Sequence, residues 1–239
     1  MKLKRIYLLL SFVLLIVIST NAIKVNAMNT GFFTEDLSDE TKTTFVASIN
    51  VSPLSAEPEK RGVLCFDVNE QGLIAIGQTG SQDKEICVYT SQGEFLYGYT
   101  FNCTQSFCVE WDDEQHVNIY FIRSDVIISL DSDGNILDIK AVQDTIDNNS
   151  YRNSLLYSTT RTVGNTTYLI RNDMGIFNWI ATSYSQIVTI DATGSESIIY
   201  DVNSMQLTKT IVTISLICVF VFVAVAVVIW QFIKLKRNA

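Results

Sequence analysis

The chain has 239 residues, of which 48% are hydrophobic and 18% are charged, and its 25 acidic residues outnumber its 17 lysines and arginines. The resulting net charge of −8 argues against a nucleic-acid-binding protein, because phosphate backbones are themselves anionic. Two apolar stretches near the ends leave a middle section that is long enough for one domain with a proper hydrophobic core.

The N-terminus has the build of a secretory signal peptide. Three basic residues within residues 2–5 precede a mostly apolar stretch, residues 6–18, and polar residues follow it. Small residues at Ala22 and Ala27 suit cleavage, and a cut after Ala27 fits best. We therefore expect residues 1–27 to be a signal peptide, with an uncleaved membrane anchor as the alternative. Either reading places the middle of the chain outside the cytoplasm.

Residues 28–61 form a polar, acidic lead-in that contains both prolines of the chain, Pro53 and Pro58. We interpret this segment as a linker or a loosely packed approach to the domain. One stretch within it, residues 43–51, alternates apolar and polar side chains and predicts a β-strand.

From residue 62 to residue 209, short apolar stretches alternate with turns. Asp or Asn opens most of these turns, and Gly ends most of them because it readily adopts the left-handed backbone that a tight turn needs. The pattern predicts an all-β meander. The expected strands are residues 63–68, 73–77, 86–89, 94–101, 117–122, 126–130, 135–140, 187–190 and 196–200.

These β segments repeat along the chain. Residues 65–96 can be laid on residues 108–137, since both run strand, acidic turn, strand, loop, strand, glycine turn, strand. A third copy spans residues 155–200 and is stretched by an insert at residues 172–183. Equivalent turn glycines lie 134 − 93 = 41 residues apart, and four strands per step of about 40–45 residues is typical of β-propeller blades.

Two hairpins, ICVYTSQGEFL (86–96) and IISLDSDGNIL (127–137), resemble hairpins of NHL-type β-propellers. The layout over residues 63–200 resembles uncharacterised bacterial membrane-anchored proteins with such a domain. The resemblance implies a propeller-like fold of about three four-stranded units and transfers no catalytic residues. Three blades are too few to close a ring, so we expect an open arc. The alternatives are closure by dimerisation and extra strands from the lead-in.

Four of the five cysteines lie in the predicted domain, and Cys218 lies in the C-terminal apolar stretch. In an oxidising compartment, four cysteines allow two disulfides in one of three connectivities. Cys103 and Cys108 are close enough to bridge across a turn, and Cys65 and Cys87 are candidates to join neighbouring strands. Free buried thiols are the alternative. A zinc site is disfavoured, because the chain has no C-x-x-C motif and a single histidine.

An aromatic row runs along residues 95–101, where Phe and Tyr alternate onto one face of a strand. Tyr97 and Tyr99 in this row, and Trp111 beyond it, are candidates for stacking on a ligand such as a sugar ring. Burial in the core is the alternative, and it is the commoner fate of an aromatic row in a sheet. Trp179 has the same two readings.

The sequence carries no recognisable catalytic or cofactor motif. His116 follows three acidic residues beside a turn, with no nucleophile motif near it. The acidic stretch at residues 131–135 lacks the spacing of an EF-hand calcium loop, so we interpret it as a turn. We therefore expect no catalytic, cofactor-binding or metal-binding residue. A carboxylate pair assembled from distant turns would still make a surface hydrolase, which we keep as a third hypothesis.

The C-terminal stretch, residues 211–233, holds 23 residues without a charge, a glycine or a proline. At about 1.5 Å per residue it can span the roughly 30 Å hydrocarbon layer as a helix. Trp230 suits the membrane interface. We expect a transmembrane helix over residues 210–233 and a cytoplasmic tail over residues 234–239, because basic residues mark the cytoplasmic side. The basic residues of the tail are Lys234, Lys236 and Arg237.

Ten basic and all 25 acidic residues fall between residues 28 and 209, so this section carries a charge of 10 − 25 = −15. Such a field favours cationic partners, and its plainest role is to keep the domain soluble. The tail, residues 234–239, is too short to fold into an output domain. We expect a membrane-tethered binding or scaffold module held by the lipid bilayer. An accessory subunit of a membrane complex is the alternative, and the partner is a second protein or a second copy of the chain.

Overall fold

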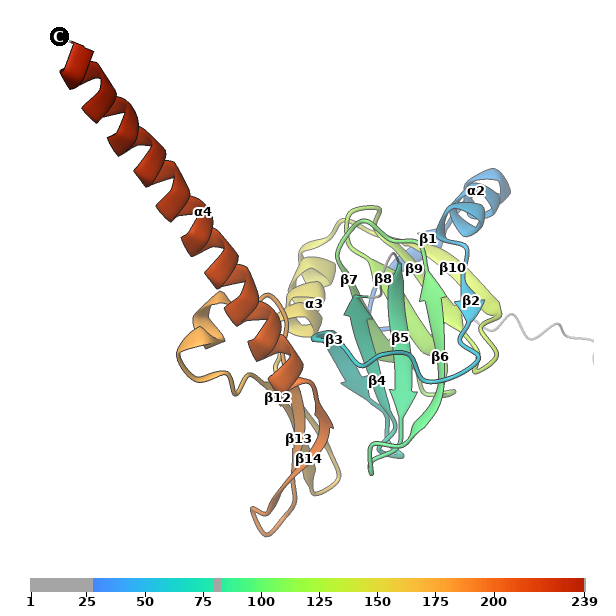
Figure 1. Ribbon diagram of the computed structural model, residues 1–239. Helices are drawn as coiled ribbons and strands as arrows, with labels where there is room; N and C mark the ends of the chain where they lie inside the picture. Colours follow the sequence, from blue (N-terminus) through green and yellow to red (C-terminus); the bar gives the residue numbers. More distant parts are fainter. Residues whose placement is uncertain (1–27, 80–82, 239) are drawn as a thin grey trace, which may run out of the picture.

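A computed structural model describes residues 28–79 and 83–238 of the chain. Three antiparallel β-sheets form a domain, and one long apolar helix leaves it at the C-terminal end (Figure 1). The prediction of a mostly β domain followed by one apolar helix is therefore confirmed. The predicted signal peptide, residues 1–27, lies outside the described residues.

Each sheet is built on a meander of four consecutive strands. The order is β2-β6-β5-β4-β3 in the first sheet, β1-β10-β9-β8-β7 in the second and β11-β12-β13-β14 in the third. The first meander comprises β3 (Val63–Val68), β4 (Ile74–Thr79), β5 (Lys84–Tyr89) and β6 (Phe95–Phe101). The second comprises β7 (Phe107–Trp111), β8 (Val117–Phe121), β9 (Val126–Leu130) and β10 (Ile136–Val142). The third comprises β11 (Thr160–Val163), β12 (Thr166–Arg171), β13 (Gln186–Ile190) and β14 (Glu196–Asp201).

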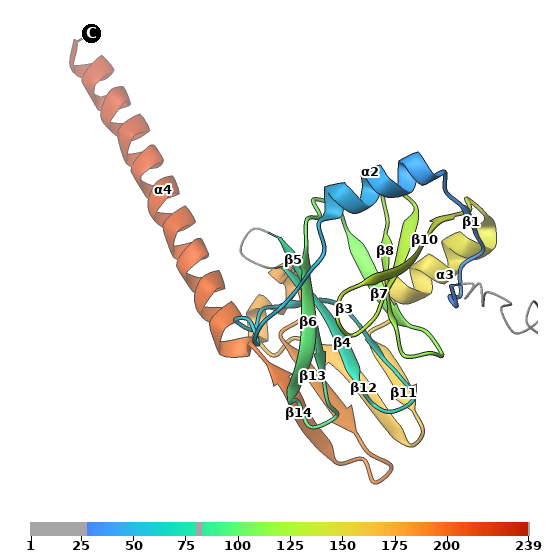
Figure 2. The same cartoon turned by 90° about the vertical axis from the view of Figure 1, so that its right-hand side faces the viewer.

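The lead-in supplies an outer strand to two of these sheets. β1 (Thr34–Asp36) pairs with β10, and β2 (Ser52–Pro53) pairs with β6, both antiparallel. These added strands cover edges that would otherwise present unpaired backbone groups. They lie on the outside, and the three sheets do not close into a ring (Figure 2).

The strand predicted at residues 43–51 is wrong, because most of this stretch belongs to α2 (Asp39–Ile49). Ser38 caps the helix by accepting a hydrogen bond from the Thr41 N–H at 3.2 Å, and acidic residues fill the first turn. Asn50 ends the helix in the left-handed conformation. The apolar alternation within residues 43–51 is short, and the helix-capping Ser38 in front of it is the stronger local signal.

The first sheet lies between the other two, so the order in space is second, first, third. Alternate residues of β5 enter different cores: Ile86 and Val88 pack with the second sheet, whereas Cys87 and Tyr89 pack with the third. Ile86, Cys87 and Val88 are 0% exposed and Tyr89 is 1% exposed. A strand that is buried on both faces reads as a continuous apolar run, which is what residues 86–89 show.

A second helix, α3 (Ile146–Tyr157), packs on the face of the second sheet that is turned away from the first. Tyr151 on α3 donates its hydroxyl hydrogen to Glu110 Oε2 on β7 at 2.7 Å, and its ring packs edge-on against Phe32 of the lead-in. All five residues of β8 are buried as a result. The pattern of short strands did not predict this helix, whose N-cap is Thr145.

The long helix, α4 (Asn203–Asn238), is continuous over 36 residues and is about 54 Å long at 1.5 Å per residue. It is long and apolar enough to cross a membrane, and its apolar side chains point outward, as Phe220 (75% exposed) and Phe222 (76%) illustrate. The helix begins before the predicted span. Its first turns therefore belong to the domain, and Met205 packs against the core between the first and third sheets.

Candidate functional site

Because consecutive strands of each meander are antiparallel, the loops between them lie at two opposite ends of the domain. One end, the proximal end, carries α4 and the 3₁₀ helix η1 (Gly175–Ile180), which lie side by side in Figure 1. The opposite end, the distal end, carries the tight turns at residues 69–72, 90–93, 112–115 and 191–194. Each of these turns includes a residue with positive φ, which is Gly in three turns and Gln115 in the fourth.

Carboxylates hold several of the turns together. Asp191 Oδ1 accepts the Thr193 N–H at 2.8 Å and the Ser195 N–H at 3.0 Å. A hydrogen bond from the Thr193 hydroxyl, together with these two, holds the pKa of Asp191 below its usual value. Asp131 accepts the Asn135 N–H in the same way at 2.8 Å, so the interpretation of that acidic stretch as a turn is confirmed.

Two adjoining cavities open at the distal end. The larger, about 380 Å³, lies between the turns of the first sheet and the third sheet. The smaller, about 190 Å³, lies between the turns of the first and second sheets. Glu70 and Gln71 line both cavities, Asp191 lines the larger one, and Asp112 and Asp113 line the smaller one. The distal hollow is therefore polar and acidic.

A mostly buried ion pair lies beneath these cavities and joins the first strands of all three meanders. Asp67 on β3 accepts the Arg161 Nε–H of β11 at 2.8 Å through Oδ1, and the Trp111 backbone N–H of β7 at 2.8 Å through Oδ2. The Arg161 guanidinium also lies over the Phe66 ring, 5.3 Å from its centroid. Burial raises the pKa of the Asp67 carboxyl, and the Trp111 N–H and Arg161 oppose that effect. No local pattern in the sequence indicates this pair, since its members are 94 residues apart.

The structure separates the three aromatic residues predicted to stack on a ligand. Tyr99 is 0% exposed, and Tyr97 packs beside it against the core between the first and second sheets. A register shift between β5 and β6 sends Phe95 to the opposite core, so the row does not stay on one face. Trp111 is half-buried and lines the smaller distal cavity. Trp111 is therefore the one candidate of the three that lines either of the two distal cavities described above.

All five cysteines are free thiols in the structure, so the predicted disulfide pairings are corrected. Cys65 and Cys87 cannot bridge, because β4 lies between their strands and their side chains enter different cores. Cys103 instead donates to the Gln105 carbonyl oxygen at 3.3 Å, and Cys108 is buried. Burial raises the pKa of Cys65 and of Cys87 to about 12, which leaves both thiols unreactive. Cys65, Cys87 and Cys108 are free buried thiols, which was the alternative prediction.

His116 is part of a turn. Its Nδ1 lies 2.9 Å from Asp112 Oδ2, and its backbone N–H donates to Asp112 Oδ1 at 2.8 Å. Both contacts hold the turn between β7 and β8. Within residues 28–79 and 83–238, no group of three or more His, Cys, Asp or Glu side chains is arranged to hold a metal ion.

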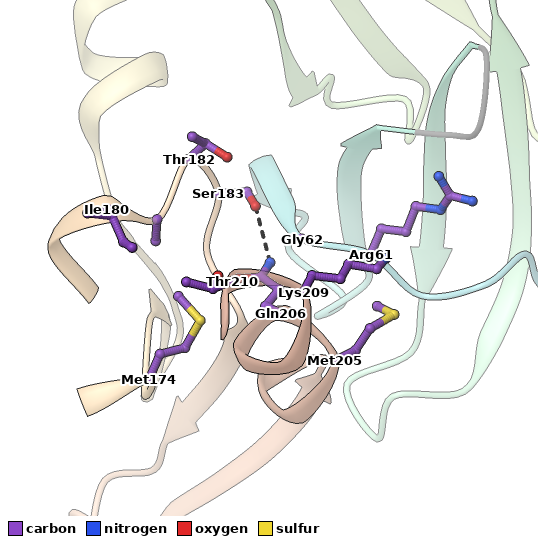
Figure 3. Close-up of a pocket in the computed structure, with 11 residues that line it drawn as sticks. Arg61, Gly62, Met174, Ile180, Thr182, Ser183, Met205, Gln206, Lys209 and Thr210 are labelled. Carbon is purple, nitrogen blue, oxygen red and sulfur yellow. Dashed lines mark hydrogen bonds between the residues drawn. The ribbon is translucent and has the colours of Figure 1, made fainter. Parts of the chain in front are cut away.

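A third cavity, also about 380 Å³, lies at the proximal end between η1 and the start of α4 (Figure 3). Gln206 on α4 closes one side by donating to Ser183 Oγ at 3.1 Å and to the Tyr184 carbonyl oxygen at 3.2 Å. Lys209 lines the cavity from α4, whereas the guanidinium of Arg61 extends away from it toward Glu59. In the sequence, this region stands out only as an insert in the third repeat.

Comparisons with known proteins add little to this geometry. No protein-family model matches the chain, and no curated protein matches it. The chain is similar to a crystal structure of a protein of unknown function from Bacteroides caccae, with 12% sequence identity and a TM-score of 0.32. The alignment covers 62% of this chain and 69% of that one. A similarity of this size carries no argument about function.

Proposed function

We propose that the chain is a membrane-tethered binding or scaffold module whose β domain lies outside the cytoplasm. The observation that carries the proposal is the junction between domain and helix. β14 ends at Asp201 and α4 begins at Asn203, and the one residue between them, Val202, is buried (5% exposed). A helix that can cross a membrane therefore follows the domain's last strand almost directly. In this proposal the short junction fixes the orientation of the domain relative to the bilayer.

The basic C-terminal tail supports an outward-facing domain, because lysine and arginine beside a span are typical of the cytoplasmic side. In this orientation the distal end points away from the membrane. The lopsided charge, 10 − 25 = −15 between residues 28 and 209, suits a domain that stays in solution beside the bilayer.

We further propose that the three sheets are propeller-like units arranged in an open arc. Each is an antiparallel meander of consecutive strands, as a propeller blade is. The first strands of the meanders converge, since β3 contacts both β7 and β11. Both features support the proposed arc of propeller-like units.

The distal end is the binding surface in this proposal. Its two cavities adjoin at Glu70 and Gln71 and are lined by carboxylates, so the ligand we expect is polar or positively charged. Loops gathered at one end of a rigid β scaffold are a common place for binding.

Topology is tested with two epitopes in the full chain, one inserted in the turn at residues 191–194 and one after residue 239. We expect antibody to reach the distal epitope on intact cells and the C-terminal epitope only after permeabilisation. The opposite pattern would refute the outward orientation.

Binding is tested by photocrosslinking in native membranes. A photoreactive residue at Gln71 should yield an adduct of defined mass, whereas one at Leu137 (49% exposed), away from the distal cavities, should not. A discrete adduct from Leu216 on α4 instead would favour the accessory-subunit function. No adduct at Gln71 would argue against a distal binding surface.

A further inference from the structure

The proximal end carries two apolar side chains that the domain does not cover. In η1, Ile176 is 79% exposed and Trp179 is 84% exposed. Leaving large apolar groups in water costs free energy. Residues three apart lie on the same side of a 3₁₀ helix, so Ile176 and Trp179 share one exposed apolar face, and such a shared face is typical of a contact site. No charged residue occurs from residue 174 to residue 183, although the domain is strongly acidic elsewhere.

Hydrogen bonds hold this segment against the start of α4. The Asn203 side-chain amide donates to the Asp173 carbonyl oxygen at 2.6 Å, which joins the first residue of α4 to the residue before Met174. The Met174 N–H donates to Asn178 Oδ1 at 2.7 Å and braces η1 from within. On the far side, Tyr184 and Val63 exchange both backbone hydrogen bonds at 2.8 and 2.9 Å. The exposed side chains are therefore presented by a braced segment.

Along the axis of α4, η1 lies level with the point where the helix becomes continuously apolar. Ile180 and Thr210 line the same proximal cavity (Figure 3), and Lys209 is the last charged residue before Lys234. A lysine at the end of a span places its ammonium among the lipid headgroups. Ile180 is therefore at headgroup level when α4 crosses a bilayer, and Trp179 is its neighbour in the chain.

The spacing to the other end of the span agrees with this placement. Trp230 lies 230 − 210 = 20 residues along α4 from Thr210, or about 30 Å, which is the thickness of the hydrocarbon layer. Tryptophan is enriched at both membrane interfaces. Trp179 and Trp230 are thus placed to mark the two faces of one bilayer.

We infer that η1 is a second membrane contact, in which Ile176 and Trp179 insert into the interfacial layer of the leaflet that α4 enters from the domain. The contact rests on the proposed tether, and it adds that the domain is seated on the bilayer at two points. The bilayer is the occupant that the geometry favours, because η1 lies beside the helix that enters it.

The test uses the full chain in phosphatidylcholine vesicles, with acyl chains that are either unmodified or brominated near the glycerol, since bromine quenches nearby tryptophan. The W230F variant keeps Trp111 and Trp179, W179F keeps Trp111 and Trp230, and W179F/W230F keeps Trp111 alone. We expect brominated lipid to reduce the emission of W230F and of W179F but not that of W179F/W230F. As a matched control, A192W added to W179F/W230F places a tryptophan on the distal turn, and its emission should be unaffected.

The outcomes separate the contact from the tether. Quenching of W179F without quenching of W230F would mean that α4 is inserted and η1 is not, which overturns the inference and leaves the tether standing. Quenching of neither variant would refute the tether and the contact together. Equal quenching of the distal A192W control would show that the whole domain lies on the lipid, and would overturn the assignment of the contact to η1.

Discussion

The first and third sheets share a four-strand plan, but they are buried to different degrees. In the first sheet, Ile86 on β5 is 0% exposed and both faces of the strand lie in a core. In the third sheet, Ile198 on β14 is 53% exposed, whereas Tyr200 is 1% exposed. A register shift between β13 and β14 pairs Ile198 with Val188 and Tyr200 with Ile187, so the two side chains lie on opposite faces of the sheet. The third sheet therefore contributes one covered face to the stack.

This difference follows from position in the stack and not from strand composition. The first sheet is central because its neighbours along the chain, the second and third sheets, pack on opposite faces of it. The third sheet is terminal, and its last strand continues into α4. Stability should accordingly reside in the first sheet and its two interfaces, while the third sheet connects the domain to the long apolar helix α4.

The largest effect is expected from truncating a side chain in the central sheet. Ile86→Ala should lower the free energy of unfolding by about 4 kcal/mol, because it removes buried methyl groups and leaves a cavity. The matched variant Ile198→Ala should change it by less than about 0.5 kcal/mol, because that side chain is largely in water. Chemical denaturation of the full chain in detergent micelles measures both, and similar losses would contradict the comparison.

Breaking the ion pair between the first and third sheets should have the next largest effect. Asp67→Asn leaves the Arg161 guanidinium buried without its counter-charge, and we expect a loss of about 3 kcal/mol. The exposed pair of Arg171 and Glu196, whose closest charged atoms are 3.0 Å apart, is the control. Glu196→Gln should cost about 0–1 kcal/mol. A double variant, Asp67→Asn with Arg161→Met, should recover part of the loss, and a further loss would show that the guanidinium is not the cause.

Removal of one hydroxyl tests the same interface, between the first and third sheets, more gently. The Tyr200 hydroxyl accepts the Arg61 N–H at 2.9 Å, and lies 2.7 Å from the Arg61 carbonyl oxygen and 2.8 Å from Gln78 Oε1. Tyr200→Phe should lower the free energy of unfolding by about 1–2 kcal/mol, since it leaves a buried polar group with one partner fewer. Tyr157→Phe, at a side chain that is 78% exposed, should be neutral in the same denaturation measurement.

The smallest effect is a pH dependence at the outer face of the second sheet. Burial raises the pKa of Glu110 above its ordinary value of 4.5, against hydrogen bonds from Tyr151 and Asn118. Because the folded state then holds the proton more tightly than the unfolded state, this group's contribution to stability is lost as the pH rises from about 4.5 through the raised pKa. Glu110→Gln should remove that decline from a plot of unfolding free energy against pH. Glu94→Gln, on an exposed side chain, should leave the plot unchanged, and an unaltered slope in Glu110→Gln would contradict the assignment.

Much of this protein follows from local patterns in the sequence. The turn at residues 131–135 was predictable because an Asp side chain bonds its own backbone and Gly134 accepts a φ of 84°. The long apolar helix α4 was predictable because an uncharged run of that length, if placed in lipid, can satisfy its backbone only as a helix. The insert at residues 172–183 was visible as an interruption of the repeat, although its 3₁₀ helix and its exposed Trp179 were not.

Tertiary structure decided which surfaces these elements share. Cys65 and Cys87 looked like partners on neighbouring strands, yet a strand alternates its side chains between two faces, and the faces lead to different cores. Asp67 and Arg161 are partners only because the second and third sheets both contact β3, through β7 and β11. Local periodicity determines what forms a strand, a turn or a helix, whereas the packing of distant segments determines which side chains meet, and no short-range pattern encodes that choice.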